Sequence, residues 1–134
     1  MIQLSLIIAT YNRAEQLLTT LRSVAMQSAK SSTWECIVVD NNSKDNTRSS
    51  VEVFIAEHSP LNIRYIFEPK QGLSHARNAG IRAAKGNILA FIDDDERIVK
   101  EFISAYIELF ERHADAMSAG GKIRSEEHTS ELQS

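Results

Sequence analysis

The chain has 134 residues, of which 43% are hydrophobic and 25% charged, and its formal net charge at pH 7 is −3. This length suits a single domain with one core, and the composition is ordinary for a soluble globular chain. The slightly negative charge argues against nucleic acid as the main partner. The single cysteine, Cys36, cannot form an internal disulfide, and its apolar neighbours predict that it is buried.

A membrane span is not expected, because the longest apolar runs are far too short to cross a bilayer. The start of the chain also lacks the basic segment of a signal peptide. We therefore expect a cytoplasmic location, and peripheral contact with the inner face of a membrane stays open.

The first third of the chain predicts a strand, a helix and a second strand. Residues 4–10 form an almost continuous apolar run, typical of a strand that is covered on both faces. Asn12, with Glu15 three residues later, predicts the N-cap of an amphipathic helix. Residues 34–39 then predict a second buried strand, which ends at Asp40.

The middle of the chain repeats this alternation. Turn residues follow Asp40, and Ser43 or Asp45 is expected to cap a second helix that stops before Pro60. Residues 63–67 predict a third strand, and residues 74–85 predict a third helix whose alanines form a close-packing face. Gly86 is expected to end that helix in the C′ position.

The last predicted strand, residues 88–92, ends in the acidic run Asp93-Asp94-Asp95-Glu96, and a fourth helix is expected over residues 99–112. Strand side chains alternate between faces, so Asp93 and Asp95 should project to one side and Asp94 to the other. Two carboxylates at close range repel each other unless a cation lies between them. A divalent-metal site at the end of this strand is therefore one hypothesis, and a solvated acidic loop is the other.

Strands that alternate with helices indicate an α/β fold with a mainly parallel sheet, most simply in the order 3-2-1-4. In such a sheet, ligands bind at the carboxyl ends of the strands where the order reverses. Three polar segments meet at that point: residues 10–13, Asp40 and residues 93–95. This convergence favours the metal site over the solvated loop.

His75, Arg77 and Asn78 lie in the first turns of the third predicted helix. A helix N-terminus attracts anions, and a guanidinium adds a fork of donors suited to phosphate oxygens. A diphosphate site is thus one hypothesis, and an exposed polar helix face is the alternative.

A phosphate-binding-loop ATPase is disfavoured because no Gly-rich loop ending in Gly-Lys-Ser/Thr is present. Gly72-Leu73-Ser74-His75-Ala76 lacks the second glycine of a nucleophile elbow, which argues against serine catalysis.

Four segments together resemble family 2 glycosyltransferases of the GT-A fold, in the family's order and spacing. They are residues 7–13 (IIATYNR), 38–47 (VVDNNSKDNT), 72–81 (GLSHARNAGI) and 91–96 (FIDDDE). The resemblance implies a Rossmann-like nucleotide-binding half that takes part in inverting sugar transfer from a nucleotide-sugar donor, with Mg²⁺ or Mn²⁺. UDP-sugar is the expected donor, and a saccharide or lipid-linked molecule is the expected acceptor.

The resemblance also implies roles for individual residues. Thr10, Tyr11 and Arg13 would line the nucleotide pocket, Asp40 would read the base, and Arg77 would contact the base or the diphosphate. Asp93 and Asp95 would be the Asp-x-Asp motif, with Asp95 the main metal ligand and Asp94 directed towards the ribose. The family's catalytic base belongs to a later, acceptor-binding half, and neither Glu96 nor Glu101 matches its position.

Residues 124–134 have no apolar periodicity, and they resemble, residue for residue, the direct translation of a common sequencing-library adapter. We therefore expect residues 1–123 to be an incomplete donor-binding portion, followed by a non-native tail. Resequencing the locus tests this, because genomic DNA that encodes these residues in place would contradict it. Self-association through an exposed sheet edge is a further expectation.

Two other functions stay open. One is a nucleotide-sugar-binding module without catalysis. The other is a different metal-dependent α/β nucleotide enzyme, such as a nucleotidyltransferase, although residues 10–13 do not supply the Gly- and Arg-rich loop that this reading requires.

Overall fold

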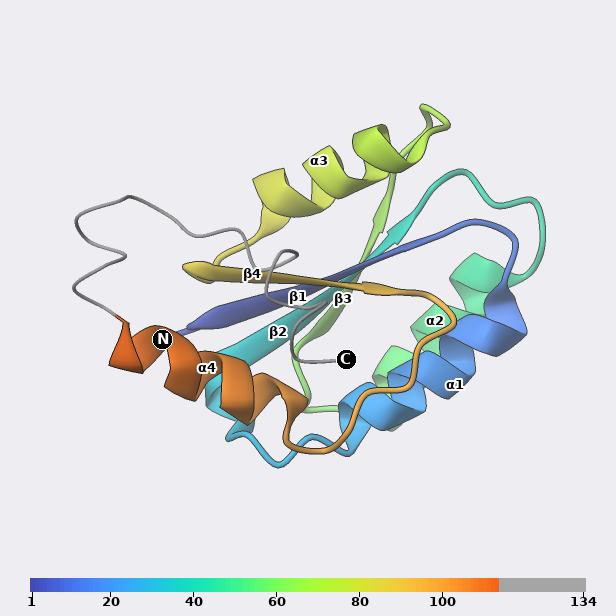
Figure 1. Cartoon of the computed structure of the whole chain (residues 1–134). Helices are drawn as coiled ribbons and strands as arrows, with labels where there is room; N and C mark the ends of the chain where they lie inside the picture. Colours follow the sequence, from blue (N-terminus) through green and yellow to red (C-terminus); the bar gives the residue numbers. More distant parts are fainter. Residues whose placement is uncertain (114–134) are drawn as a thin grey trace.

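The computed structural model describes residues 1–113, which form a parallel sheet between two layers of helices (Figure 1). The predicted tail, residues 124–134, and the expected end of the native chain near residue 123 lie outside the described residues. The strands are β1 (Leu4–Thr10), β2 (Trp34–Asp40), β3 (Ile63–Phe67) and β4 (Ile88–Asp93). The helices are α1 (Ala14–Ala25), the short 3₁₀ helix η1 (Ser31–Thr33), α2 (Thr47–Glu57), α3 (Leu73–Ala83) and α4 (Phe102–Arg112).

The sheet has the order β3-β2-β1-β4, and all of its pairings are parallel, as the sequence predicts. Strand β1 lies between β2 and β4 and pairs with both along its length. Its last residue, Thr10, is opposite Asp40, and Ala9 is opposite Asp93. The register therefore brings the polar ends of three strands to one edge of the sheet.

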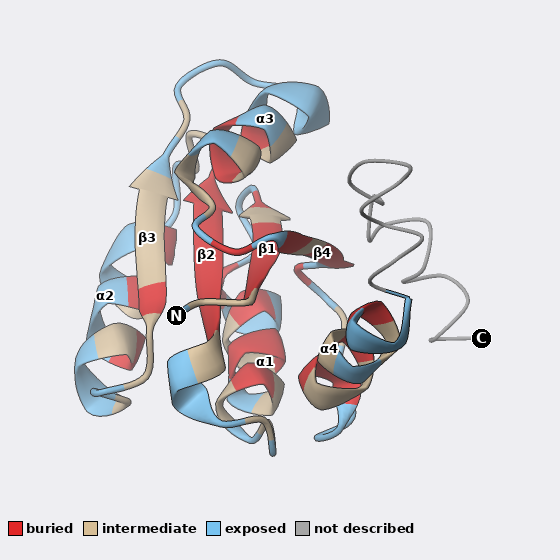
Figure 2. Cartoon of the chain, turned by 90° about the vertical axis from the view of Figure 1, so that its left-hand side faces the viewer, coloured by how far each residue is buried: buried red, intermediate tan, exposed pale blue. Residues whose placement is uncertain are grey.

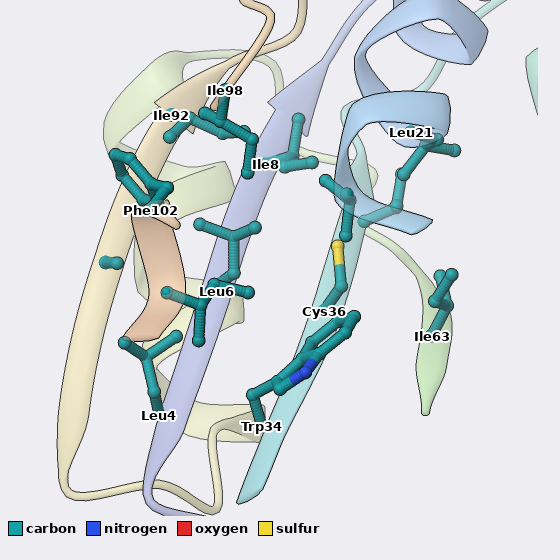
Figure 3. Packing of buried hydrophobic residues seen from close by; sticks show 14 of the residues in the cluster. Leu4, Leu6, Ile8, Leu21, Trp34, Cys36, Ile63, Ile92, Ile98 and Phe102 are labelled. Carbon is teal, nitrogen blue, oxygen red and sulfur yellow. The ribbon is translucent and has the colours of Figure 1, made fainter. Parts of the chain in front are cut away.

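The larger core lies on the face covered by α1, α2 and α4 (Figure 2). Alternate residues of β1 and β2, among them Leu6, Ile8 and Cys36, point into this layer (Figure 3). Cys36 is fully buried, as predicted, and burial raises the pKa of its thiol well above the usual range. Burial of this much apolar surface is the main favourable term in folding.

Helix α3 covers the opposite face and approaches the sheet closely through small residues (Figure 2). Ala76 and Ala79 are buried against it. Gly80 lies so near β1 that an added Cβ would stand 2.5 Å from Cγ2 of Ile7. The predicted alanine face of this helix is therefore its contact with the sheet.

A buried polar network joins the elements at the edge opposite the acidic run. The carboxylate of Glu35 is fully buried and accepts hydrogen bonds from Ser5 Oγ (2.6 Å), the backbone N–H of Lys85 (2.7 Å) and Arg64 Nη2 (2.8 Å). Arg64 Nη2 also donates to the carbonyl of Ala83 (2.6 Å), at the end of α3. Every one of these groups gains a partner, so the network satisfies a charge that burial alone would penalise.

Two local predictions at helix ends are wrong. Asn12 does not cap α1, whose N-cap residue is Arg13 and makes no side-chain cap hydrogen bond; the Asn12 amide oxygen instead accepts from the N–H of Lys44 (2.7 Å). Gly86 does not end α3, which stops at Ala83, and its N–H donates to Ser5 Oγ (2.8 Å). A Cβ at Gly86 would be 2.8 Å from the backbone of Leu4, so the glycine permits a close approach to β1.

Asp45 was one of two predicted caps of α2; the N-cap residue of that helix is Asn46, and the Asp45 carboxylate instead accepts hydrogen bonds from backbone N–H groups at the starts of both neighbouring helices. Its Oδ1 accepts from the N–H of Thr47 at 3.0 Å, at the start of α2. Its Oδ2 accepts from the N–H of Ala14 at 3.4 Å, at the start of α1. Within residues 1–113, no helix is long and apolar enough to cross a membrane.

Candidate functional site

A cleft of about 440 Å³ opens at the carboxyl ends of β1 and β4. Its lining includes six of the predicted site residues: Thr10, Tyr11, Arg13, Asp93, Asp94 and Asp95. Ala9, Asn41 and Leu73 complete the lining, whereas Asp40 and Arg77 are not part of it. The sheet order thus brings together side chains that are more than 80 residues apart in the chain, such as Thr10 and Asp94.

Asp94 is the most enclosed of the three aspartates. Its Oδ2 accepts a hydrogen bond of 2.9 Å from Thr10 Oγ1, and its backbone carbonyl accepts one of 2.9 Å from Thr20 Oγ1. Burial raises the pKa of Asp94, although the Thr10 hydrogen bond and the positive charge of Arg13 act in the opposite direction. The carboxylate is therefore held in one orientation at the floor of the cleft.

Arg13 supplies a positive charge beside these carboxylates. Its Nη1 is 3.3 Å from Oδ2 of Asp95 and 3.7 Å from Oδ1 of Asp94. The side chains of Arg13 and Asp95 are each about half exposed, at 50% and 52%, so water screens their attraction.

Asp93 and Asp95 are exposed at the mouth of the cleft, as the strand alternation predicts. The chain turns here: the N–H of Glu96 donates to the carbonyl of Asp93 at 3.2 Å, and the N–H of Asp93 donates to the side chain of Glu96 at 2.7 Å. Within residues 1–113, no three His, Cys, Asp or Glu side chains form a ready-made metal cage. The residues nevertheless fit Mg²⁺ or Mn²⁺, since such ions take oxygen ligands and commonly use one or two carboxylates together with substrate phosphates and water.

Asp40 is 2% exposed and does not line the cleft, although its neighbour Asn41 does. Its Oδ1 accepts from the N–H of Ser43 at 2.9 Å, and its Oδ2 accepts from the hydroxyl of Tyr65 at 2.6 Å. Burial and this carboxylate together raise the pKa of Tyr65 well above its usual range, so the phenol stays protonated as the donor.

Asn41 is a cleft residue that the sequence assigned only to a turn. Its Nδ2 donates to the carbonyls of Glu68 (3.1 Å) and Lys70 (2.7 Å), and its Oδ1 accepts from the N–H of Gly72 (2.9 Å). Gly72 has a φ of 135°, which other residues rarely adopt. The Asn41 amide thus fixes the loop that leads into α3. Within α3, the guanidinium carbon of Arg77 lies over the Phe91 ring, 5.7 Å from the ring centroid. In the sequence, the only feature that pointed to Asn41 as a site residue was its position directly after the end of a strand.

The family model "Glycosyl transferase family 2" matches residues 5–133 of this chain. The chain belongs to glycosyl transferase family 2. The matched range includes residues 124–133, which we expect to be a foreign tail, so the origin of that segment stays a prediction.

Curated relatives of this chain include the glycosyltransferase AglE of Haloferax volcanii, which is 41% identical over 91 residues, covering 68% of this chain and 30% of that protein. The chondroitin synthase of Escherichia coli is 39% identical over 108 residues, covering 79% of this chain and 15% of that protein. This chain therefore spans less than a third of the length of either relative.

Solved glycosyltransferase structures share the GT-A fold seen here. S. aureus TarS 1-349 superimposes with a TM-score of 0.76 at 28% identity, covering 84% of this chain and 33% of that one, and it has also been solved with UDP and with UDP-GlcNAc. The mannosyltransferase PcManGT from Pyrobaculum calidifontis, in complex with GDP-Man and Mn²⁺, gives a TM-score of 0.75 at 28% identity, covering 81% and 32%. The predicted fold and family are thus confirmed.

Proposed function

We propose that this chain binds the nucleotide-sugar donor of an inverting, divalent-metal-dependent glycosyltransferase. The observation that carries the proposal is the cleft at the switch point of the sheet, where a buried Asp94, two exposed aspartates and Arg13 meet. The family membership supports sugar transfer, and the nucleotide-sugar complexes of TarS and PcManGT support this class of donor.

We assign separate roles to the aspartates of the cleft. Asp93 and Asp95 would hold Mg²⁺ or Mn²⁺, and the enclosed Asp94 would accept a hydrogen bond from the ribose. A cation bound there would neutralise negative charge on the departing nucleoside diphosphate. Thr10 orients Asp94 through its 2.9 Å hydrogen bond, so the ribose contact would be preorganised.

Two predicted residues lie beside the cleft rather than in its lining. Asp40 would read a uracil-type imide N–H, with Tyr65 and the N–H of Ser43 holding its carboxylate in place. Arg77 would approach the base or diphosphate from α3. Transfer itself also needs a base for the acceptor hydroxyl, and we propose that a segment beyond the described residues supplies it.

Calorimetric titration of UDP and GDP in the presence of Mn²⁺ tests the proposal. Asp95→Asn should lower nucleotide affinity at least tenfold, because it removes a charged ligand of the proposed metal site. Glu108→Asn is a matched control on the exposed face of α4, and it should bind like the wild type. Equal, Mn²⁺-dependent affinity in wild type and Asp95→Asn would show that the metal assignment is wrong. Activity assays of the complete gene product would separate an enzyme from a binding module.

A further inference from the structure

We infer that Arg13 is a built-in counter-cation for Asp94 and Asp95, and that it couples the binding of a divalent cation to the binding of the nucleotide. The inference rests on the proposed function, since it concerns the same carboxylates. Its starting observation is that Nη1 of Arg13 lies 3.3 Å from Oδ2 of Asp95 and 3.7 Å from Oδ1 of Asp94, and that all three residues line the cleft.

The backbone under Arg13 is held firmly, although its side chain is half exposed. The N–H of Asn12 donates to Ser43 Oγ at 2.9 Å, and the Asn12 side chain accepts from the N–H of Lys44 at 2.7 Å. On the other side, the carbonyl of Arg13 accepts the first helical hydrogen bond of α1, from Leu17 at 2.9 Å. The guanidinium is therefore tethered near the carboxylates, and only its flexible side chain has to move.

A divalent cation that binds Asp95 would meet this guanidinium at short range. Two positive charges at such a distance repel each other, so metal binding to the free protein requires Arg13 to swing away from its partner. A nucleoside diphosphate supplies anionic oxygens that suit the guanidinium fork. When the diphosphate binds, Arg13 gains a new partner and releases the carboxylate to the metal.

This exchange makes the two ligands cooperative, and linkage requires the effect to be reciprocal. The nucleotide should tighten metal binding, and the metal should tighten nucleotide binding. A metal that bridges the diphosphate also gives cooperativity, so cooperativity in the wild type alone does not identify Arg13. The distinguishing quantity is the affinity for the metal in the absence of nucleotide.

The test is a titration of the full chain with Mn²⁺ alone, followed by electron paramagnetic resonance of free Mn²⁺, and then the same titration with saturating UDP. Arg13→Gln should bind Mn²⁺ alone about three- to tenfold more tightly than the wild type, because a half-exposed ion pair competes only modestly. Arg13→Lys keeps the charge and should resemble the wild type. With UDP present, the advantage of Arg13→Gln should shrink or reverse.

Arg112→Gln is the matched control, because it removes the same charge from an exposed pair with Glu108 at the far end of α4. It should leave Mn²⁺ affinity within about twofold of wild type, because Arg112 is exposed to screening by solvent and is not part of the cleft lining. Unchanged or weaker Mn²⁺ binding by folded Arg13→Gln, with UDP–Mn²⁺ binding intact in the wild type, would overturn this inference alone. Absence of Mn²⁺ binding to the wild type, even with UDP, would overturn the proposed metal site and this inference together.

Discussion

Asp94 and Asp95 are neighbours in the sequence, yet the fold gives their carboxylates different surroundings. Asp94 is 9% exposed and bonded to Thr10, whereas Asp95 is exposed and faces only Arg13 among the contacts described above. Strand alternation predicts the opposite directions of the two side chains. It cannot predict the Thr10 partner, because that contact depends on how β1 and β4 pair.

The hydroxyl of Thr10 should matter for stability as well as for the site. Thr10→Val keeps the shape of the side chain but removes the donor to Asp94, which leaves a largely buried carboxylate without that partner. We expect a loss of about 1–2 kcal/mol in the free energy of unfolding. Urea denaturation measures this change. Thr10→Ser retains the hydroxyl and should lose less than half as much stability as Thr10→Val. Equal losses in the two variants would show that packing, and not the hydrogen bond, is responsible.

Glu35 should make stability depend on pH. Burial alone would raise the pKa of Glu35, but hydrogen bonds from Ser5, Lys85 and Arg64 outweigh it and hold the pKa below its ordinary value of 4.5. A carboxyl with a lowered folded-state pKa stabilises the protein above its unfolded pKa, and this contribution is lost as pH falls through the folded pKa. The wild type should therefore lose part of its stability below pH 4.5.

Glu35→Gln tests this network directly. The variant should be about 2 kcal/mol less stable at neutral pH, because Arg64 loses its buried anionic partner. Its stability should also fall less steeply than that of the wild type in acid, as measured by urea denaturation at several pH values. Glu52→Gln removes an exposed partner of Arg48 and should change stability by less than about 0.5 kcal/mol. If the stability of Glu35→Gln fell as steeply in acid as that of the wild type, Glu35 would not be the source of the pH dependence.

At the scale of elements, the sequence predicts every strand of the described sheet and their order. Continuous apolar runs bounded by polar residues identify β1, β2 and β4, and the handedness of parallel connections limits the order. Helix starts were predicted less well. Helix α4 begins at Phe102, not near residue 99, because the carbonyls of Val99 and Lys100 accept hydrogen bonds from Gln27 and Ser28. A local pattern cannot reveal such distant partners.

The contact between α3 and the sheet should reverse the usual effect of a Gly-to-Ala change. Alanine in a helix interior is normally more favourable than glycine by about 1 kcal/mol. At Gly80 the added Cβ would meet the buried Ile7 at 2.5 Å, so Gly80→Ala should destabilise the protein by about 1–3 kcal/mol. A thermal melt checks the sign. A higher melting temperature for Gly80→Ala would mean that α3 does not pack so closely.

At the scale of the whole molecule, the cleft joins segments from both ends of the described chain. A ligand that contacts residues on β1 and β4 at once favours the folded state by mass action. We expect UDP with Mn²⁺ to raise the melting temperature in a concentration-dependent manner. EDTA should abolish most of the shift, because it removes the cation. A shift that is the same with and without EDTA would argue against metal dependence.

The same molecule has two open sheet edges within residues 1–113, β3 and β4. Unpaired strand edges can pair with other chains, so self-association stays a prediction for sedimentation or light scattering to test.

Strand β1 is bonded on both sides, to β2 and to β4. Its interior amides can therefore open to solvent only when the sheet itself separates. Amide hydrogen exchange in residues 5–9 should be the slowest in the protein and should report global unfolding. Strand β1 also ends in Thr10, at the cleft. A nucleotide that binds the cleft should therefore raise the free energy of exchange of these amides by the same amount as it raises the free energy of global unfolding.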